Sequence, residues 1–434
     1  MLLERIHLDR NDYEIYSIKA GKVIVNTTTV NWLEVSDKEA DLFDKILDFK
    51  DCEVDEIKYK SFIFKLLVNN IIQFQSDEKG KLKETKTRVY FAPNPYCNLE
   101  CVYCYAEATS PKVKLDFNES ETYKIIDNFA IDNVEEVVIT GGEPLMRTDI
   151  FDIVDYIKYK KKKTISILTN GILINEKNIK HMQKFDKVTL SLDASEAMIN
   201  DITRGSGTFE KIVHAVRLLK QHKIRVGITS VVSKVNLANV QALLNFIREE
   251  LGVEEHKTTI HVSHGRGKDS EIECTAMQVQ EFRRLYLMDY IRNGLKSNTS
   301  LFEPQLVRNV QRQMCGVATA EIFVNEKGEV YPCRLFVEDK YLLGTLLENN
   351  LEDIMNNEKT NNFKEKMKVN SIESCNACKS RYLCGGGCRS SHSCYTGSIK
   401  ESHEPLCDMI RQDIKSSILL QEGINPLTLE RIGR

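Results

Sequence analysis

The cysteines are the residues of this chain whose spacing most directly predicts chemistry. The sequence holds thirteen of them, and ten fall into two groups. Three form a C-x3-C-x2-C motif, made of Cys97, Cys101 and Cys104. The second group lies in the C-terminal third and comprises Cys315, Cys333, Cys375, Cys378, Cys384, Cys388 and Cys407. Thiolates at such spacings bind metals or iron–sulfur clusters far more often than they pair as disulfides.

The N-terminal triad predicts an iron with an open coordination position. A four-iron cluster normally takes four protein thiolates, so three thiolates leave one iron without a protein ligand. The triad follows a predicted strand, at the end where parallel α/β folds bind their ligands. A three-cysteine zinc knuckle or unligated core thiols are the alternatives, and three thiols on one short loop disfavour the latter. We therefore expect an active-site loop.

Three further predicted strands end in segments suited to ligand binding. The second strand ends in Gly141-Gly142-Glu143-Pro144, where paired glycines let a backbone approach a ligand closely. The third ends at Asn170, and the fourth ends at Ser191 to Asp193, with Arg204 shortly after. One such segment alone is a weak signal. Together they indicate one site, because the carboxyl ends of parallel strands meet at the same edge.

The elements that position these residues alternate between strands and helices. Predicted strands cover 88–91, 136–140, 165–169, 188–192, 226–232 and 260–263. Predicted helices between them include 119–131, 149–159, 209–221 and 240–250. Such alternation implies a parallel sheet or barrel, and six units are fewer than the eight of a complete barrel. The sequence therefore predicts an α/β fold with a partial (β/α)6 barrel over residues 88–300.

Two other regions flank the predicted barrel. Residues 1–85 contain predicted strands 13–19 and 22–27 and predicted helices 38–49 and 54–68, and the polar stretch 78–87 is typical of a linker. Residues 301–434 are irregular and rich in cysteine, so metal sites rather than a large core should hold them together. We expect three domains: 1–85, 88–300 and 301–434.

Composition excludes several classes of partner. A formal net charge of −3 counts against nucleic-acid binding. No apolar stretch approaches the roughly 20 residues of a membrane helix, and the N-terminus has no apolar secretion signal. We therefore expect a cytoplasmic protein whose thiols stay reduced. For His261 and His264, a histidine satisfied in the core or at the surface is favoured over one that faces a substrate.

The N-terminal triad, with Tyr103 inside it and Gly-Gly-Glu-Pro downstream, resembles the radical S-adenosylmethionine superfamily over about residues 88–300. The resemblance implies that the amino and carboxylate groups of S-adenosylmethionine chelate the open iron. It also assigns cofactor contacts to this chain. The segment Gly141, Gly142 and Glu143 would lie along the methionine amino group, Ser191 and Arg204 would hold the methionine carboxylate, and Asn170 and Asp193 would meet the ribose.

The C-terminal cysteines resemble the SPASM extension of peptide- and protein-modifying radical enzymes, which binds two auxiliary clusters. This implies three [4Fe-4S] clusters in all. One auxiliary cluster would be held by Cys375, Cys378, Cys384 and Cys407, and the other by Cys315, Cys333 and Cys388. The second set is one thiolate short, so Cys394, Cys274 or a substrate thiolate would complete it. Zinc ribbons also pair C-x2-C units, but they rarely place seven cysteines behind such a triad.

The N-terminal region looks like the winged-helix leader-binding domain of ribosomal-peptide maturases. An extended leader would add a strand to an exposed sheet edge. The region carries more Asp and Glu than Lys and Arg, which counts against DNA binding. A small structural cap is the alternative interpretation.

Together the resemblances imply a radical maturase that abstracts hydrogen from a precursor peptide and installs a crosslink, with a cysteine thioether favoured. A flavodoxin or ferredoxin would supply electrons. Carbon–carbon crosslinking or modification of a peptide terminus is the alternative, followed by a non-catalytic electron-transfer protein. Formylglycine formation is disfavoured because Arg334 follows Cys333, where sulfatase-maturing relatives have an acidic residue. Arginine cannot act as a base at neutral pH.

Overall fold

The chain divides into two compact units, which are described separately. A computed structural model describes residues 6–48, 56–74, 86–111, 117–293 and 310–432. Unit 1 comprises Met1–Lys83, Phe302–Cys315 and Glu365–Arg434, and unit 2 comprises Glu84–Leu301 and Gly316–Lys364. Most of the expected linker 78–87 lies outside the described residues. Within the described part of the chain, no helix has both the length and the apolar character needed to cross a bilayer.

Unit 2 is built on a nine-stranded sheet, in the order β11-β10-β9-β8-β7-β6-β12-β13-β14. Strands β6 to β11 run parallel, which confirms the expected partial barrel. Their bounds are Thr87–Ala92, Val134–Ile139, Thr164–Thr169, Lys187–Ser191, Val226–Val232 and Glu255–Ile260. A further strand, β12 (Glu321–Asn325), pairs in parallel with β6 and continues antiparallel into β13 (Glu329–Tyr331) and β14 (Gly344–Thr345).

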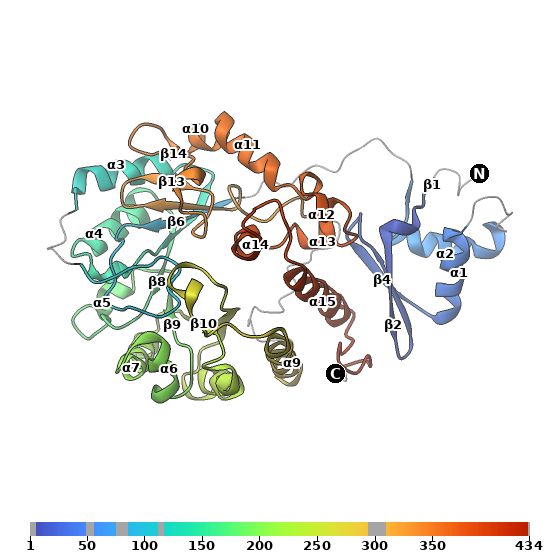
Figure 1. Ribbon diagram of the computed structural model, residues 1–434, viewed down its shortest axis with the longest axis horizontal. Helices are drawn as coiled ribbons and strands as arrows, with labels where there is room; N and C mark the ends of the chain where they lie inside the picture. Colours follow the sequence, from blue (N-terminus) through green and yellow to red (C-terminus); the bar gives the residue numbers. More distant parts are fainter. Residues whose placement is uncertain (1–5, 49–55, 75–85, 112–116, 294–309, 433–434) are drawn as a thin grey trace. The chain divides into compact units, whose positions relative to one another are not determined.

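Helices lie around the outside of the parallel strands (Figure 1). Those of unit 2 that lie between or after the strands are α3 (Glu119–Phe129), α4 (Ile150–Asp155), α5 (Ile179–Met182), α6 (Ala197–Arg204), α7 (Thr208–Gln221), α8 (Val240–Asn245), α9 (Ala276–Arg292) and α10 (Leu351–Asn356). Helix α7 illustrates why these helices cover the sheet: Ile212, Val216 and Leu219 recur at helical spacing, form one apolar face and are fully buried. The predicted helices 149–159 and 240–250 each form a short α-helix that continues as a π-helical turn.

The predicted strand 260–263 is wrong in position. Strand β11 instead spans Glu255–Ile260, and the buried side chains within it are His256 and Thr258. The inward face of this strand is polar, so the alternation of apolar and polar residues that marks a half-buried strand is missing from the sequence.

The N-terminal part of unit 1 is a three-stranded antiparallel sheet followed by two helices. Strands β2 (Tyr13–Ile18) and β3 (Gly21–Asn26) match the two predicted strands, and β4 (Asn31–Val35) is a third that the sequence did not predict. Helix α1 (Asp37–Leu47) begins with a capping box between Ser36 and Glu39, and α2 is Glu56–Val68. A short pair, β1 (Ile6–His7) and β5 (Gln73–Phe74), accompanies the sheet.

Both faces of this sheet are buried within unit 1. Ile24 packs with Phe43 and Leu66 on the side of α1 and α2. On the other side, Trp32 packs with Ile418 and Leu419 of helix α15 (Glu404–Gln421), as Figure 1 shows for the two elements. The expectation that the C-terminal region lacks a sizeable core is therefore wrong, because α15 completes a core with the N-terminal sheet.

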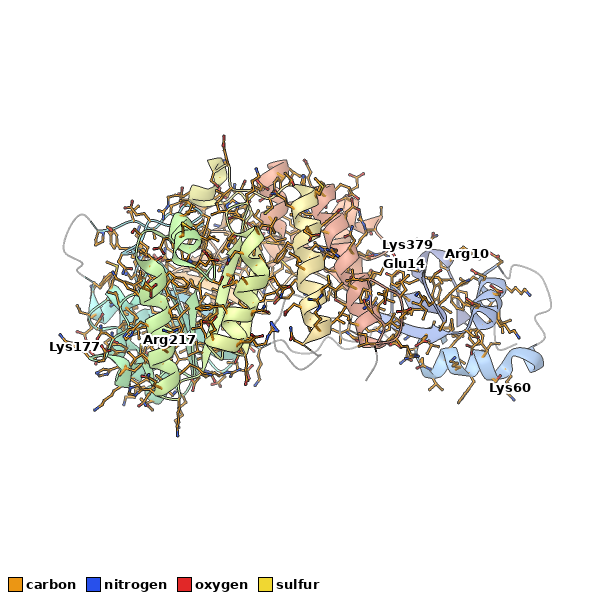
Figure 2. All side chains as sticks on the ribbon, turned by 90° about the horizontal axis from the view of Figure 1, so that it is seen from below. Arg10, Glu14, Lys60, Lys177, Arg217 and Lys379 are labelled. Carbon is orange, nitrogen blue, oxygen red and sulfur yellow. The ribbon has the colours of Figure 1, made fainter. Side chains whose placement is uncertain are left out.

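The remaining C-terminal helices of the chain are α11 (Glu358–Met367), α12 (Glu373–Asn376), α13 (Arg381–Cys384) and α14 (Arg389–Thr396). Leu383 of α13 belongs to the same core as Trp32, which fixes the position of the adjacent Cys384. Ser380 also contacts Glu14 of β2 at 3.5 Å, and Figure 2 shows Glu14 beside Lys379. The cysteine-rich segment is thus anchored on the sheet.

Candidate radical and cluster sites

The cysteine triad lies on a loop directly after β6. The Cys97 amide donates to Thr109 O at 3.0 Å, and the Cys104 amide donates to Cys101 O at 3.2 Å. Burial raises the pKa of Cys97 to about 11, and the thiols of Cys101 and Cys104 act on it electrostatically. The loop therefore brings the three thiols close enough to interact electrostatically, and binding to iron would have to displace the proton of Cys97.

The spacing required of the three thiols depends on the kind of metal site that they form. Among the described residues, no three Cys, His, Asp or Glu side chains converge as ligands of one metal ion. Zinc sites bring every sulfur within about 2.3 Å of one ion. In a four-iron cluster each thiolate binds a different iron, which allows wider spacing. The described cysteines also form no disulfide.

Arg266 holds the cysteine loop from the far edge of the sheet. Its Nε donates to Cys101 O at 3.1 Å, and its Nη1 donates to Ala108 O at 2.7 Å. Its backbone amide donates to Cys104 O at 3.1 Å. The preceding Gly265 has a φ of 52°, and a Cβ there would lie 2.4 Å from Cys104 O. Arg266 was not predicted from the sequence; its place in a Gly-Arg-Gly turn after a strand is a local signal that could have indicated it.

The glycine pair after β7 allows the chain to pack against itself. A Cβ on Gly142 would lie 2.0 Å from Tyr96 O, and one on Gly141 would lie 2.4 Å from Asn94 O. The glycines therefore let the segment that leads into Cys97 lie directly on the end of β7.

Glu143 joins the ends of β7 and β8. Its side chain is completely buried, and burial raises its pKa. One oxygen accepts from the Thr169 hydroxyl at 2.8 Å and the Leu145 amide at 3.0 Å, and the other accepts from the Asn170 amide at 2.8 Å. Asn170 Nδ2 in turn donates to Asn98 Oδ1 at 2.8 Å and lies 3.7 Å from Cys97 Sγ. Asn170 is thus beside the triad.

Asp193 and Arg204 form a buried ion pair next to the triad. Arg204 Nη2 donates to Asp193 Oδ1 at 2.9 Å, and Nε lies 2.7 Å from Oδ2. The Tyr103 hydroxyl and the Val231 amide also donate to Asp193. Burial opposes the charge of Arg204, but Asp193 raises its pKa above the usual range. Both carboxylate oxygens of Asp193 therefore already have hydrogen-bond or ion-pair partners, whereas Arg204 Nη1 makes no hydrogen bond within the described residues.

Two other sequence-predicted positions lie at the same edge. Ser191 ends β9, half-buried, opposite Thr229 of β10. His261 follows β11, is 4 % exposed, and its ring lies 6.4 Å from that of Tyr103. Neither ring nitrogen of His261 has a hydrogen-bond partner in the described part of the chain. The expectation of a satisfied histidine is therefore wrong for His261.

Four C-terminal thiols lie together in unit 1. Burial raises the pKa of Cys384 to about 11, and Cys375, Cys407 and Cys378 all act on it electrostatically. This is the set expected to hold one auxiliary cluster. Of the other set, Cys315 and Cys388 belong to unit 1, and Cys333 belongs to unit 2, where it acts on Tyr105 beside Cys104.

Comparison with known families decides the identity. The radical SAM superfamily model matches residues 92–247, and the SPASM iron–sulfur cluster-binding domain model matches residues 315–379. The chain belongs to the radical SAM/SPASM enzymes. The two matched segments contain the triad and four of the seven C-terminal cysteines.

Curated relatives of this radical SAM/SPASM enzyme share about a quarter of its residues. It is 26% identical to the antilisterial bacteriocin subtilosin biosynthesis protein AlbA of Bacillus subtilis, over 67% of this chain and 64% of the relative. The alignment thus spans less than two thirds of that relative. It is 28% identical to the mycofactocin maturase MftC of Mycobacterium tuberculosis, over 72% of this chain and 80% of the relative.

Solved structures share the fold of the radical SAM/SPASM enzyme. Streptococcus suis SuiB with bound S-adenosylmethionine matches with a TM-score of 0.60 and 18% identity, over 92% of this chain and all of SuiB. The enzyme anSMEcpe with bound AdoMet matches with a TM-score of 0.64 and 22% identity, over 77% of this chain and 98% of anSMEcpe.

Proposed function

We propose that this enzyme modifies a ribosomally made precursor peptide and installs a cysteine thioether crosslink. The observation that carries the proposal is the presence of two gathered thiol sets in one chain, the triad after β6 and the four C-terminal thiols of unit 1. Relatives named for biosynthesis of the bacteriocin subtilosin and for mycofactocin maturation support a peptide substrate, as does SuiB, which was solved with its precursor peptide SuiA.

The residues around the triad would bind and orient S-adenosylmethionine. Bound at a cluster on Cys97, Cys101 and Cys104, this cofactor supplies a 5′-deoxyadenosyl radical that removes hydrogen from a peptide C–H. Arg204 would present Nη1 to the methionine carboxylate, with Ser191 beside it, while Asp193 fixes the guanidinium from behind. The backbone of Gly141 to Glu143 would face the amino group, and Asn170 the ribose. Since Asp193 is already occupied, a ribose hydroxyl would have to share its oxygens.

The unequal auxiliary sets support a thioether product. Cys315, Cys333 and Cys388 supply three thiolates, which leaves one iron for a substrate cysteine. Cys388 is the N-cap of α14, and Cys394 lies within the helix more than one turn further along, which disfavours Cys394 as the fourth ligand. Bond formation removes two hydrogens from the peptide. One leaves a C–H as a hydrogen atom, and the other leaves the cysteine thiol as a proton. The remaining electron passes to an auxiliary cluster.

The N-terminal sheet of unit 1 offers edges for a leader peptide. Among the described residues, β2 and β4 each pair on one side only, with β3. An extended leader would add a strand to one of these edges. A flavodoxin or ferredoxin would supply the electron that starts each cycle.

Mass spectrometry of a co-expressed, cysteine-containing precursor peptide tests the proposal. We expect a loss of two hydrogens per crosslink together with loss of one thiol that iodoacetamide can alkylate. The same mass loss with every thiol still alkylatable would instead identify a carbon–carbon crosslink. Failure of the reduced, reconstituted enzyme to cleave S-adenosylmethionine would favour the electron-transfer alternative.

A further inference from the structure

Arg389, the first residue of α14, is a buried cation without a carboxylate partner. Its side chain belongs to unit 1 and is 1 % exposed. Its nitrogens donate to Gly386 O at 3.2 Å, Ile399 O at 2.9 Å, Ser402 Oγ at 3.3 Å and the carbonyl of Glu401. All four acceptors are neutral. Within the described residues, no Asp or Glu side chain forms an ion pair with this guanidinium.

The ionisable groups that act most strongly on the charge of Arg389 are cysteine thiols. Burial lowers the pKa of Arg389, and the thiols that oppose this effect are Cys375, Cys407, Cys315 and Cys384. Three of these belong to the set of four expected to hold one auxiliary cluster. Ser402 Oγ, which accepts from Arg389, lies 3.9 Å from Cys375 Sγ. Ser402 thus connects the guanidinium to one thiol of the set.

A buried charge of this kind requires compensation. Arginine stays protonated in proteins, so it cannot escape burial by losing its proton. Buried ions are otherwise paired or bound to metal centres. Thiolates bound to a four-iron cluster carry a net negative charge, and they would supply the missing partner.

The other cations around these thiols are better neutralised or more exposed. Arg411 is 36 % exposed and pairs with Glu404 and Asp408. Burial and the charge of Arg389 lower the pKa of His392 to about 4, so His392 is neutral at pH 7. Arg381 is half-buried and lies over the ring of Tyr382. Arg389 is therefore the fixed, fully buried positive charge at this site.

We propose that Arg389 is the counter-ion of the auxiliary cluster bound by Cys375, Cys378, Cys384 and Cys407 and that it raises the reduction potential of that cluster. One-electron reduction adds a negative charge to the cluster, and a fixed cation stabilises the reduced state more than the oxidised state. Arg389 thereby makes this cluster the better acceptor for the electron released from the substrate. The inference rests on the proposed ligand set.

A redox titration monitored by electron paramagnetic resonance tests this role. The full-length enzyme, reconstituted without oxygen, is titrated with dithionite in a background of Cys101→Ala and Cys333→Ala, which removes the signals of the other two clusters. We expect Arg389→Met to lower the midpoint potential. Arg389→Lys keeps the charge and should stay near the parent value. Arg411→Met, which removes a neutralised and exposed charge, should shift the potential much less than Arg389→Met.

Iron and sulfide content separates the possible failures. If Cys384→Ala leaves the cluster content unchanged, the ligand set is wrong, and the proposed function is revised with it. If Arg389→Met holds a full cluster at the parent potential, the counter-ion role is overturned while the ligand set stands. Loss of the cluster in Arg389→Met but not in Arg389→Lys supports the role. Loss in both variants overturns it, because the hydrogen bonds rather than the charge would then matter.

Discussion

Asp193 positions Arg204, the residue proposed to bind the methionine carboxylate. Its two oxygens hold Arg204 and also accept from Tyr103, which lies inside the cysteine triad. The pair thus connects the end of β9 to the loop that carries the thiols. Because a buried guanidinium needs a charged partner, the carboxylate sets the direction in which Arg204 Nη1 points.

We expect Asp193→Asn to weaken binding of S-adenosylmethionine by about 10- to 100-fold, since a charged hydrogen bond contributes about 1.5–3 kcal/mol. Equilibrium dialysis with the reconstituted enzyme measures the effect. Asp127→Asn is the control, because Asp127 is an exposed carboxylate paired with Lys161 on the surface of unit 2. Equal affinities in both variants would show that Arg204 does not depend on Asp193.

His256 should make the stability of unit 2 depend on pH. Burial, with Arg248 nearby, lowers its pKa from 6.5 to about 3. Between these values the unfolded chain binds a proton that the folded chain does not. The free energy of unfolding should therefore fall as pH drops below 6.5, by up to about 1.4 kcal/mol per pH unit.

Denaturant unfolding at pH 7 and pH 5 measures this dependence. His256→Gln cannot take up the proton, so its stability should fall less than that of the wild type over the same interval. His214→Gln should behave like the wild type, because His214 is 58 % exposed. Identical pH slopes for the wild type and His256→Gln would contradict the prediction.

The sequence reveals residues whose roles depend on local spacing and hides those whose partners are remote. The triad and Gly141 to Glu143 were predicted because their members are neighbours in the chain. Arg266 was missed because its carbonyl acceptor Cys101 is 165 residues away. The unpartnered ring of His261 was missed because buried hydrogen bonding cannot be read from residue type.

At the scale of elements, the turn after β11 should control whether the triad can hold iron. Gly265 has a positive φ and lies against Cys104 O, so Gly265→Ala should displace the cysteine loop. We expect the loss of one cluster, about four irons per chain, in a colorimetric iron assay.

Gly207→Ala is the matched control for this experiment. Gly207 also has a positive φ, of 72°, but a Cβ there would meet nothing within 4 Å. The control therefore tests backbone strain alone. If both variants lose iron equally, contact between the turn and the cysteine loop is not what matters.

Strands with an apolar inward face were predicted within two residues at either end, as β6 to β10 show. Strand β11 was misplaced because its buried residues are His256 and Thr258. Strand β12 was missed because it takes its position from β6, which lies far away in the chain. Strand β4 pairs with its neighbour β3 and was missed because its residues do not alternate between buried and more exposed positions. Local pattern thus predicted the barrel and not the strands that extend it.

At the scale of the whole molecule, the core shared by the N-terminal sheet and α15 should make unit 1 unfold as one body. Trp32 is fully buried between Val25 of the sheet and Ile418 of the helix. We expect Trp32→Ala to cost about 3–5 kcal/mol and to lower the iron content of the C-terminal set.

Chemical denaturation followed by circular dichroism and iron release measures both effects. Phe64→Ala in α2 is the control: this ring is 66 % exposed, so its removal should change stability by less than about 0.5 kcal/mol. Full iron retention in a destabilised Trp32→Ala enzyme would contradict the dependence of the cysteine-rich segment on the sheet. This dependence was beyond sequence reasoning, because Val25 and Leu419 lie near opposite ends of the chain.

Unit 1 combines segments from both ends of the chain, and this has a consequence for synthesis on the ribosome. The face of β3 and β4 that carries Trp32 emerges early, but its partners Ile418 and Leu419 are translated almost four hundred residues later. At elongation rates of about 5–20 residues per second, the nascent sheet waits on the order of 20 to 80 s with an uncovered apolar face. The N-terminal sheet should therefore stay protease-sensitive in stalled nascent chains until α15 has left the exit tunnel.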